Sequence, residues 1–76
     1  AEAIEIVAKT SDNPENIVGK DIADITTPEG TTIAAVFDNK NIKIAHHDLK
    51  IQENDHLILF LSDSSKFEEV ERRLTK

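Results

Sequence analysis

Three histidines and their acidic neighbours are the side chains best suited to chemistry in this 76-residue sequence. His46 and His47 are adjacent and precede Asp48, and His56 follows Asp55. Imidazole and carboxylate groups at such short spacing suit a metal site or a proton relay. Adjacent residues of an extended chain point to opposite faces, however, so His46 and His47 do not easily share one ion, and no third ligand is evident. Solvated side chains in a loop before a strand are the simpler interpretation.

Nucleophilic and phosphate-binding patterns are weaker still. Ser62, Ser64 and Ser65 lie where a strand passes into a helix, a position at which helix capping accounts for hydroxyl groups. The two glycines, Gly19 and Gly30, are too far apart for a dinucleotide or P-loop fingerprint, which places several glycines within one turn. The sequence therefore predicts a binding module that is not an enzyme, with no catalytic residues, no metal site and no cofactor of its own.

Composition excludes several classes of partner. The formal net charge of −6 argues against nucleic acid, since phosphate binding needs a basic surface, and also against docking on anionic lipid. No apolar run approaches the ~20 residues that a membrane span requires, so direct membrane insertion is not expected. There is no cysteine for disulfides and no signal peptide pattern. These features predict a cytoplasmic protein.

The length predicts a single domain covering residues 1–76. A chain this short buries only about 60% of the surface that its unfolded form exposes, so its stability is thin. The sequence contains no Met and starts at Ala1 in a strand-like pattern, which predicts a fragment of a longer protein. A second copy or a neighbouring domain is the expected source of further burial.

The expected elements are read from hydrophobic periodicity and turn residues. Residues 2–10 alternate as a strand, and residues 17–25 carry apolar side chains at helical spacing. Two further strands at 31–37 and 41–45 are expected to form a hairpin around an Asp-Asn-Lys-Asn turn. Residues 56–62 are apolar on both faces, which predicts the most central strand.

The clearest local prediction is a C-terminal helix. Ser65 and Glu68 have the spacing of a capping box, and Phe67, Val70 and Leu74 form a stripe that is expected to be buried. The order of elements predicts an α+β fold: a small, mainly antiparallel β-sheet, with a short helix after strand 1 and a C-terminal helix.

Excess apolar surface is the remaining unusual feature. In strict alternation, Ile33, Ala35 and Phe37 face one way, while Ala34 and Val36 face the other. Both sides of this strand need cover, and a second subunit packed on Ala34 and Val36 across a two-fold axis would supply it. The sequence thus predicts a homodimer with these two residues at the interface. The alternative is that both helices and the loop at 46–51 cover everything within one chain.

Short motifs in a fixed order carry a resemblance to a known family. The chain resembles the TrkA C-terminal domain, the C-terminal ligand-binding module of regulators of potassium conductance. The motifs that carry the resemblance, across almost the whole chain, are Val18-Gly19-Lys20, Ile22-Ala-Asp-Ile25, Pro28-Glu-Gly-Thr31, Ile33-Ala-Ala-Val36, Ile42-Lys-Ile44, Leu49 with Ile51, and Asn54-Asp55-His56.

The resemblance implies a regulatory role. Members are cytoplasmic, peripheral parts of subunits that gate a Trk-type membrane potassium transporter at the inner face of the cell membrane. Their NAD or ATP sites lie in separate Rossmann-type domains of the full chain. Their C-terminal modules dimerise and, in some relatives, bind cyclic di-AMP at the dimer interface. By this resemblance the ligand-site positions here are Ile33, Ala34, Asn41, Ile42 and His46.

Two departures bear on the ligand. Many members place an Arg-Gly or Arg-Asp pair at the hairpin tip, where this chain has Asp38-Asn39. An acidic side chain repels phosphate, so an anionic effector is disfavoured. A Pro that is common after the second hairpin strand is also missing near Ala45-His46.

Three hypotheses follow. The leading one is a regulatory ligand-binding and dimerisation domain. The second is a purely structural dimerisation cap without a ligand. The third is a small metal-dependent enzyme that uses His46, His47 and Asp48.

Overall fold

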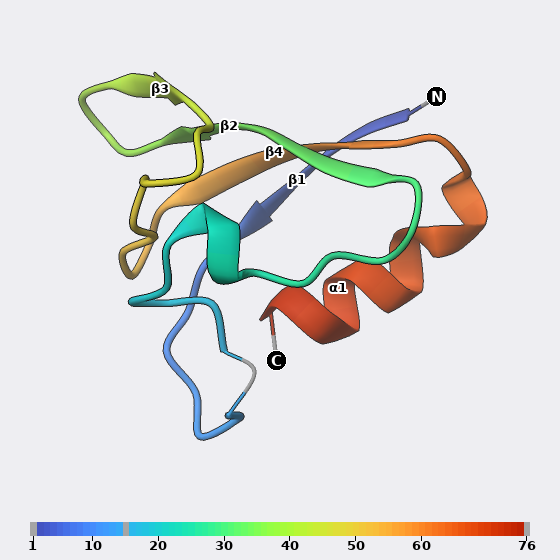
Figure 1. The fold of residues 1–76 in the computed structure, drawn as a ribbon, viewed down its shortest axis with the longest axis horizontal. Coiled ribbons are helices and arrows are strands. Elements are labelled where there is room, and N and C mark those ends of the chain that lie inside the picture. The colour runs from blue at the N-terminus through green and yellow to red at the C-terminus, as the bar shows by residue number, and fades with distance from the viewer. Residues whose placement is uncertain (1, 15, 76) are drawn as a thin grey trace.

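A computed structural model describes residues 2–14 and 16–75 of the chain. The described strands form one antiparallel sheet in the order β1-β4-β2-β3, and the helical segments lie on one side of it (Figure 1). This arrangement confirms the predicted α+β class. The elements in chain order are β1 (Glu2–Val7), η1 (Ile22–Asp24), β2 (Thr31–Phe37), β3 (Ile42–Ile44), β4 (His56–Leu61), η2 (Ser64–Lys66) and α1 (Phe67–Thr75).

Strand β4 is an interior strand of the sheet, as predicted from its apolar residues. It pairs with β1 on one side and with β2 on the other. Leu57, Leu59 and Leu61 alternate along it and are fully buried. Ile58 and Phe60 point to the opposite face because side chains alternate along a strand. A strand with apolar side chains on both faces therefore lies in the interior of the sheet, where it pairs with a strand on each side.

Strand β2 contains an irregularity that changes which side chains share a face. Its register against β4 shifts between Ile33 and Ala35, so that one additional residue, Ala34, is inserted into β2. Ile33 lies opposite Leu59, and Val36 lies opposite Leu57. Residues directly opposite each other share a face, so Ile33 and Val36 both face the helices. The predicted strict alternation along β2 is therefore wrong, because a β-bulge reverses its phase.

The helix predicted at 17–25 is reduced to the single 3-10 turn η1. The backbone around it is used for pairing instead: Gly19 N donates to Ile51 O and Ile22 N donates to Leu49 O, both at 2.8 Å. Gly19 adopts a φ of 89°, which suits a glycine and interrupts a helix. Pairing with the loop before β4 thus competes with helix formation.

The C-terminal helix begins with a different cap from the one predicted. Asp63 is the N-cap of η2, and its carboxylate accepts a hydrogen bond from Ser65 N at 2.9 Å. This backbone donor, followed by the Ser65 hydroxyl, holds the pKa of Asp63 below its ordinary value. The predicted capping box at Ser65 is wrong by two residues because the chain first makes a 3-10 turn.

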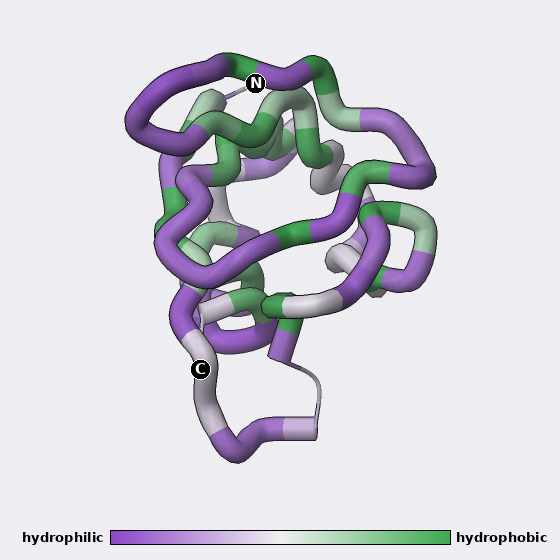
Figure 2. The backbone as a smooth tube through the Cα atoms, turned by 90° about the vertical axis from the view of Figure 1, so that its left-hand side faces the viewer, coloured by the Kyte–Doolittle hydropathy of each residue, from purple (hydrophilic) through white to green (hydrophobic). Residues whose placement is uncertain are grey.

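Helix α1 covers the sheet through part of the predicted stripe. Val70 and Leu74 are buried with the leucines of β4, whereas Phe67 keeps 38% of its surface exposed. Phe67 belongs to the first turn of α1, next to the exposed strand-to-helix junction. In Figure 2 the loops at the edge of the view are mostly hydrophilic. The core therefore lies between the sheet and α1.

Candidate functional site

The face of the sheet that points away from α1 is the candidate functional site, and it is called the outer face below. Strand register identifies its members, because residues directly opposite each other on antiparallel strands share a face. Ile58 of β4 lies opposite Glu5 of β1 and opposite Ala35 of β2. Extending these pairings gives the outer face: Ala3, Glu5, Val7, Thr32, Ala35, Phe37, Ile42, Ile44, His56, Ile58 and Phe60.

Large apolar side chains on the outer face are left open to solvent. Ile42 is 78% exposed, Ile44 is 76% exposed and Phe60 is 51% exposed. Fully burying one such side chain is worth roughly 1.5–3 kcal/mol relative to leaving it exposed. A group of these side chains on one face, bordered by polar loops, is typical of a surface that meets a partner.

The hairpin turn fixes the strand that carries the two exposed isoleucines. The carboxylate of Asp38 accepts hydrogen bonds from Lys40 N at 2.7 Å and from Asn41 N at 2.9 Å. These two backbone donors, with the Lys40 bond as the larger effect, lower the pKa of Asp38. The ionised carboxylate therefore closes the turn from β2 into β3, and Ile42 follows directly.

One polar pair interrupts the outer face. Nδ1 of His56 lies 2.6 Å from the carboxylate of Glu5, across the β1–β4 pairing. The ring of Phe37 stacks on the imidazole of His56, with centroids 4.8 Å apart. Both partners are partly exposed, with 34% of the His56 side chain and 48% of the Glu5 side chain accessible. Apart from this pair, the outer face carries no titratable side chain among the described residues.

The two residues predicted at a dimer interface are more buried than expected. Val36 is 2% exposed within a single copy, and Ala34 is partly buried at the bulge. The three most exposed large apolar side chains, Ile42, Ile44 and Phe60, lie instead on β3 and on β4. The interface at Ala34 and Val36 stays a prediction, whereas the accessible apolar surface belongs to the outer face.

The five residues predicted at a ligand site are spread over different surfaces. Ile33 faces the helical side and lines a groove of about 230 Å³ with Ile22 and Ile25. Ile42 is on the outer face, and His46 lies in the loop after β3. Two positions make backbone contacts at the hairpin. Ala34 O accepts from Ala45 N at 3.3 Å, and Asn41 N donates to Asp38.

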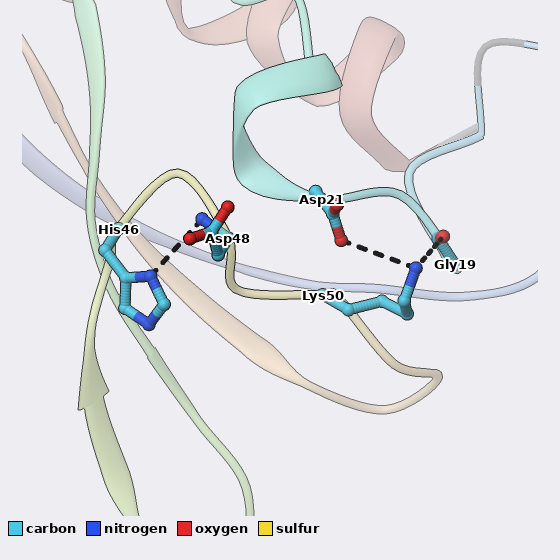
Figure 3. A network of polar contacts seen from close by, with 5 residues as sticks. All are labelled: Gly19, Asp21, His46, Asp48 and Lys50. Carbon is cyan, nitrogen blue, oxygen red and sulfur yellow. Dashed lines mark hydrogen bonds and ion pairs between the residues drawn. The ribbon is translucent and has the colours of Figure 1, made fainter.

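The histidine and aspartate cluster of the loop after β3 is exposed. His46 Nδ1 accepts from the backbone N–H of Asp48 at 3.3 Å (Figure 3). His47 Nε2 lies 3.3 Å from the Asp48 carboxylate, with both side chains more than three quarters exposed. Among residues 2–14 and 16–75, no three His, Cys, Asp or Glu side chains are grouped so as to hold a metal ion.

A second contact in the same view ties this loop to the segment before η1. Lys50 Nζ lies 3.4 Å from the Asp21 carboxylate and donates to Gly19 O at 3.3 Å (Figure 3). Asp21 and Lys50 also form an isolated antiparallel bridge. These contacts hold the two loops together, so we assign them a structural role.

Sequence reasoning missed Ile44, Phe60 and the Glu5–His56 pair as parts of the site. The spacing Ile42-Lys-Ile44 on an edge strand was one available signal, because a three-residue strand shows both apolar side chains on one face. The apolar run at 56–61 was another, since β4 needs cover on both sides. The Glu5–His56 contact joins residues 51 positions apart and has no local signature.

Comparison with known proteins found a matching family model and similar sequences. A family model described as the TrkA-C domain matches residues 6–75. A relative from Halomonas elongata, named Trk system potassium uptake protein TrkA, is 44% identical over 72 residues. A relative of the same name from Haemophilus influenzae is 40% identical over 72 residues. Each match covers 95% of this chain but 16% of the relative's length.

Two solved structures share the fold. One is described as an RCK domain with cda; its TM-score is 0.76, its identity is 14%, and the match covers 97% of this chain and 99% of that one. The other is the RCK_C domain dimer of S. agalactiae BusR in complex with c-di-AMP. It has a TM-score of 0.73 and 18% identity, and it covers 93% of this chain and 92% of that one. At these identities the likeness establishes the fold alone.

Proposed function

The chain belongs to the TrkA-C domain family, and we propose that it is a regulatory module that pairs with a second copy through its outer face. The exposure of Ile42, Ile44 and Phe60 on one side of the sheet carries this proposal. The shared fold with a domain that is described as a dimer supports a second copy as the occupant. The relatives' name supports a role for the longer protein in potassium uptake.

The proposed mechanism is a change of packing that neighbouring parts of the longer protein transmit. Two arrangements of the pair, bound with different affinity by an effector or a partner, are the requirement for such coupling. We propose Rossmann-type domains of the full chain and a Trk-type membrane potassium transporter as these partners, at the cytoplasmic side of the membrane. Within the described residues, no helix is long and apolar enough to cross a bilayer.

Pairing is tested by sedimentation equilibrium of the 76-residue chain and of the double variant Ile42→Ser/Ile44→Ser. We expect a concentration-dependent dimer for the original chain and at least a tenfold weaker dimer for the variant, since two anchors lose roughly 1–3 kcal/mol or more of apolar contact. Phe67→Ser is the matched control, because Phe67 is a partly exposed apolar residue of α1 rather than of the outer face. A strictly monomeric chain at all concentrations contradicts the proposal.

A ligand-free structural cap is the second candidate, and one observation favours it. The Asp38 carboxylate stands ionised at the hairpin turn, where it repels an anionic effector. For the alternative in which the domain binds a ligand, we propose an effector site formed by Ile33, Ala34, Asn41, Ile42 and His46. Calorimetric titration with cyclic di-AMP separates the two: heat that disappears in Asn41→Ala supports the site, and no heat with the dimer intact supports the cap.

A further inference from the structure

We propose that pairing through the outer face takes up a proton at the Glu5–His56 pair, so that the dimer strengthens as the pH falls below neutrality. This inference rests on the proposed self-association and adds its regulation. Its basis is the placement of one titratable pair within an otherwise uncharged surface. A second copy seated on this surface would remove water from both side chains.

The surroundings of the pair are apolar on the strands themselves. Val7 lies opposite His56, Ile58 lies opposite Glu5, and Phe37 stacks on the imidazole. The partner's outer face would bring the same kind of side chain from the other side. Besides the pair, the outer face as defined above carries one other polar side chain, that of Thr32.

Other charged groups lie near His56 at the end of the sheet. A hollow of about 570 Å³ next to the ring is lined by one cation, Lys9, and by three carboxylates, those of Asp38, Glu53 and Asp55. From β3 the nearest charge is Lys43, which lies opposite Val36 and therefore on the helical side of the strand. A proton that the pair takes up is therefore surrounded by more negatively charged than positively charged side chains.

The direction of the pH effect follows from counting protons. With one proton, the pair is electrically neutral as a whole, whether the proton resides on the imidazole or on the carboxyl group. Without it, Glu5 carries a negative charge beside a neutral ring. Burying an uncompensated charge is far more costly than burying a neutral, hydrogen-bonded pair. The dimer therefore binds the proton more tightly than the monomer does.

The sign of the linkage is that of a group whose proton affinity rises on association. The proton-dependent stabilisation of the dimer is fully present below the pKa that the pair has in the monomer. It is lost as the pH rises through the higher pKa that the pair has in the dimer. Histidine is the side chain whose charge ordinarily changes between about pH 5 and 8, so the pH dependence of dimerisation is measured across this range.

The test is sedimentation equilibrium of the 76-residue chain at pH 8.0, 7.0 and 6.0, in 0.5 M NaCl to suppress general repulsion between copies of net charge −6. We expect the dimer dissociation constant to fall about tenfold or more from pH 8.0 to pH 6.0, since up to one proton per copy is taken up. His47→Gln, an exposed histidine outside the outer face, is the matched control and should keep this pH dependence.

Two variants complete the test. His56→Gln should give a dissociation constant that is flat over the same pH range and weaker at pH 6.0. The double variant Glu5→Gln/His56→Gln removes both charges at constant size, so it should dimerise at all three pH values without pH dependence. A pH-independent dimer of the original chain, or pH dependence that persists in His56→Gln, overturns the inference and leaves the proposed pairing intact. A chain that never dimerises overturns both.

Discussion

The two faces of one four-stranded sheet differ in how they treat apolar side chains. On the helical face, Leu57, Leu59 and Leu61 are fully buried against α1. On the outer face, Ile42, Ile44 and Phe60 keep half or more of their surface in solvent. The helical face of the sheet is therefore covered within one chain, whereas the outer face is left uncovered. The difference separates residues that hold the fold together from residues that are available to a partner.

Strand β4 shows this difference at neighbouring positions. Leu59 and Phe60 are consecutive, yet one is 0% exposed and the other is 51% exposed. Alternation along a strand is the cause, since each residue points to the face opposite its neighbour. A pair of truncations at these two positions thus compares the faces with the backbone held constant.

The largest expected effect is on the helical face. Leu59→Ala should lower the free energy of unfolding by about 2–5 kcal/mol, because it leaves a cavity in the core. Phe60→Ala is the matched variant and should cost less than about 1 kcal/mol, since half of the ring is already solvated. Urea titration followed by circular dichroism measures both. An equal loss of unfolding free energy in the two variants would contradict this difference between the faces.

A smaller effect is expected where the outer face depends on the hairpin turn. Asp38→Ala removes the carboxylate that accepts from Lys40 N and Asn41 N, so β3 should open more often. Amide hydrogen exchange at Lys43, paired with Val36, should accelerate several-fold while the amides of β4 remain protected. Asp48→Ala, at an exposed loop carboxylate beyond β3, serves as the control. Unchanged exchange at Lys43 would mean that Asp38 does not hold the strand.

The smallest effect concerns the cap of the helical face. The pKa of Asp63 is lowered by the Ser65 backbone N–H and hydroxyl, so its stabilisation is present above its ordinary value of 3.8 and fades as the pH falls below that value. Asp63→Asn should therefore lower the urea midpoint at pH 7 and make little difference at pH 2.5. A difference between the chains that grows in acid would contradict this assignment of the cap.

Sequence reasoning correctly predicted those parts of the fold that are marked by local sequence patterns. The apolar run at 56–62 predicted an interior strand, and the Asp38-Asn-Lys-Asn41 turn predicted the hairpin, as the structure has them. The bulge at Ala34 escaped prediction, because no residue type marks the position where one extra residue enters β2. After this extra residue, each side chain of β2 faces the side opposite to the one that strict alternation from the start of the strand predicts.

Long-range contacts explain the other differences. The predicted helix at 17–25 competes with hydrogen bonds from Gly19 and Ile22 to residues near position 50, which local periodicity does not report. Glu5 and His56 meet only because β1 and β4 are neighbours in the sheet. Apolar excess on β2 predicted a partner surface there, whereas the structure leaves the most exposed apolar side chains on β3 and β4.

The most direct test of the outer face as the meeting surface is an isotope-filtered nuclear Overhauser experiment on a mixture of labelled and unlabelled chains. The account predicts contacts between copies from the methyl groups of Ile42, Ile44 and Ile58 to the ring of Phe60. Methyl groups of Val70 and Leu74 should show contacts within one copy only. Contacts between copies that arise from α1, with none from these outer-face side chains, would contradict it.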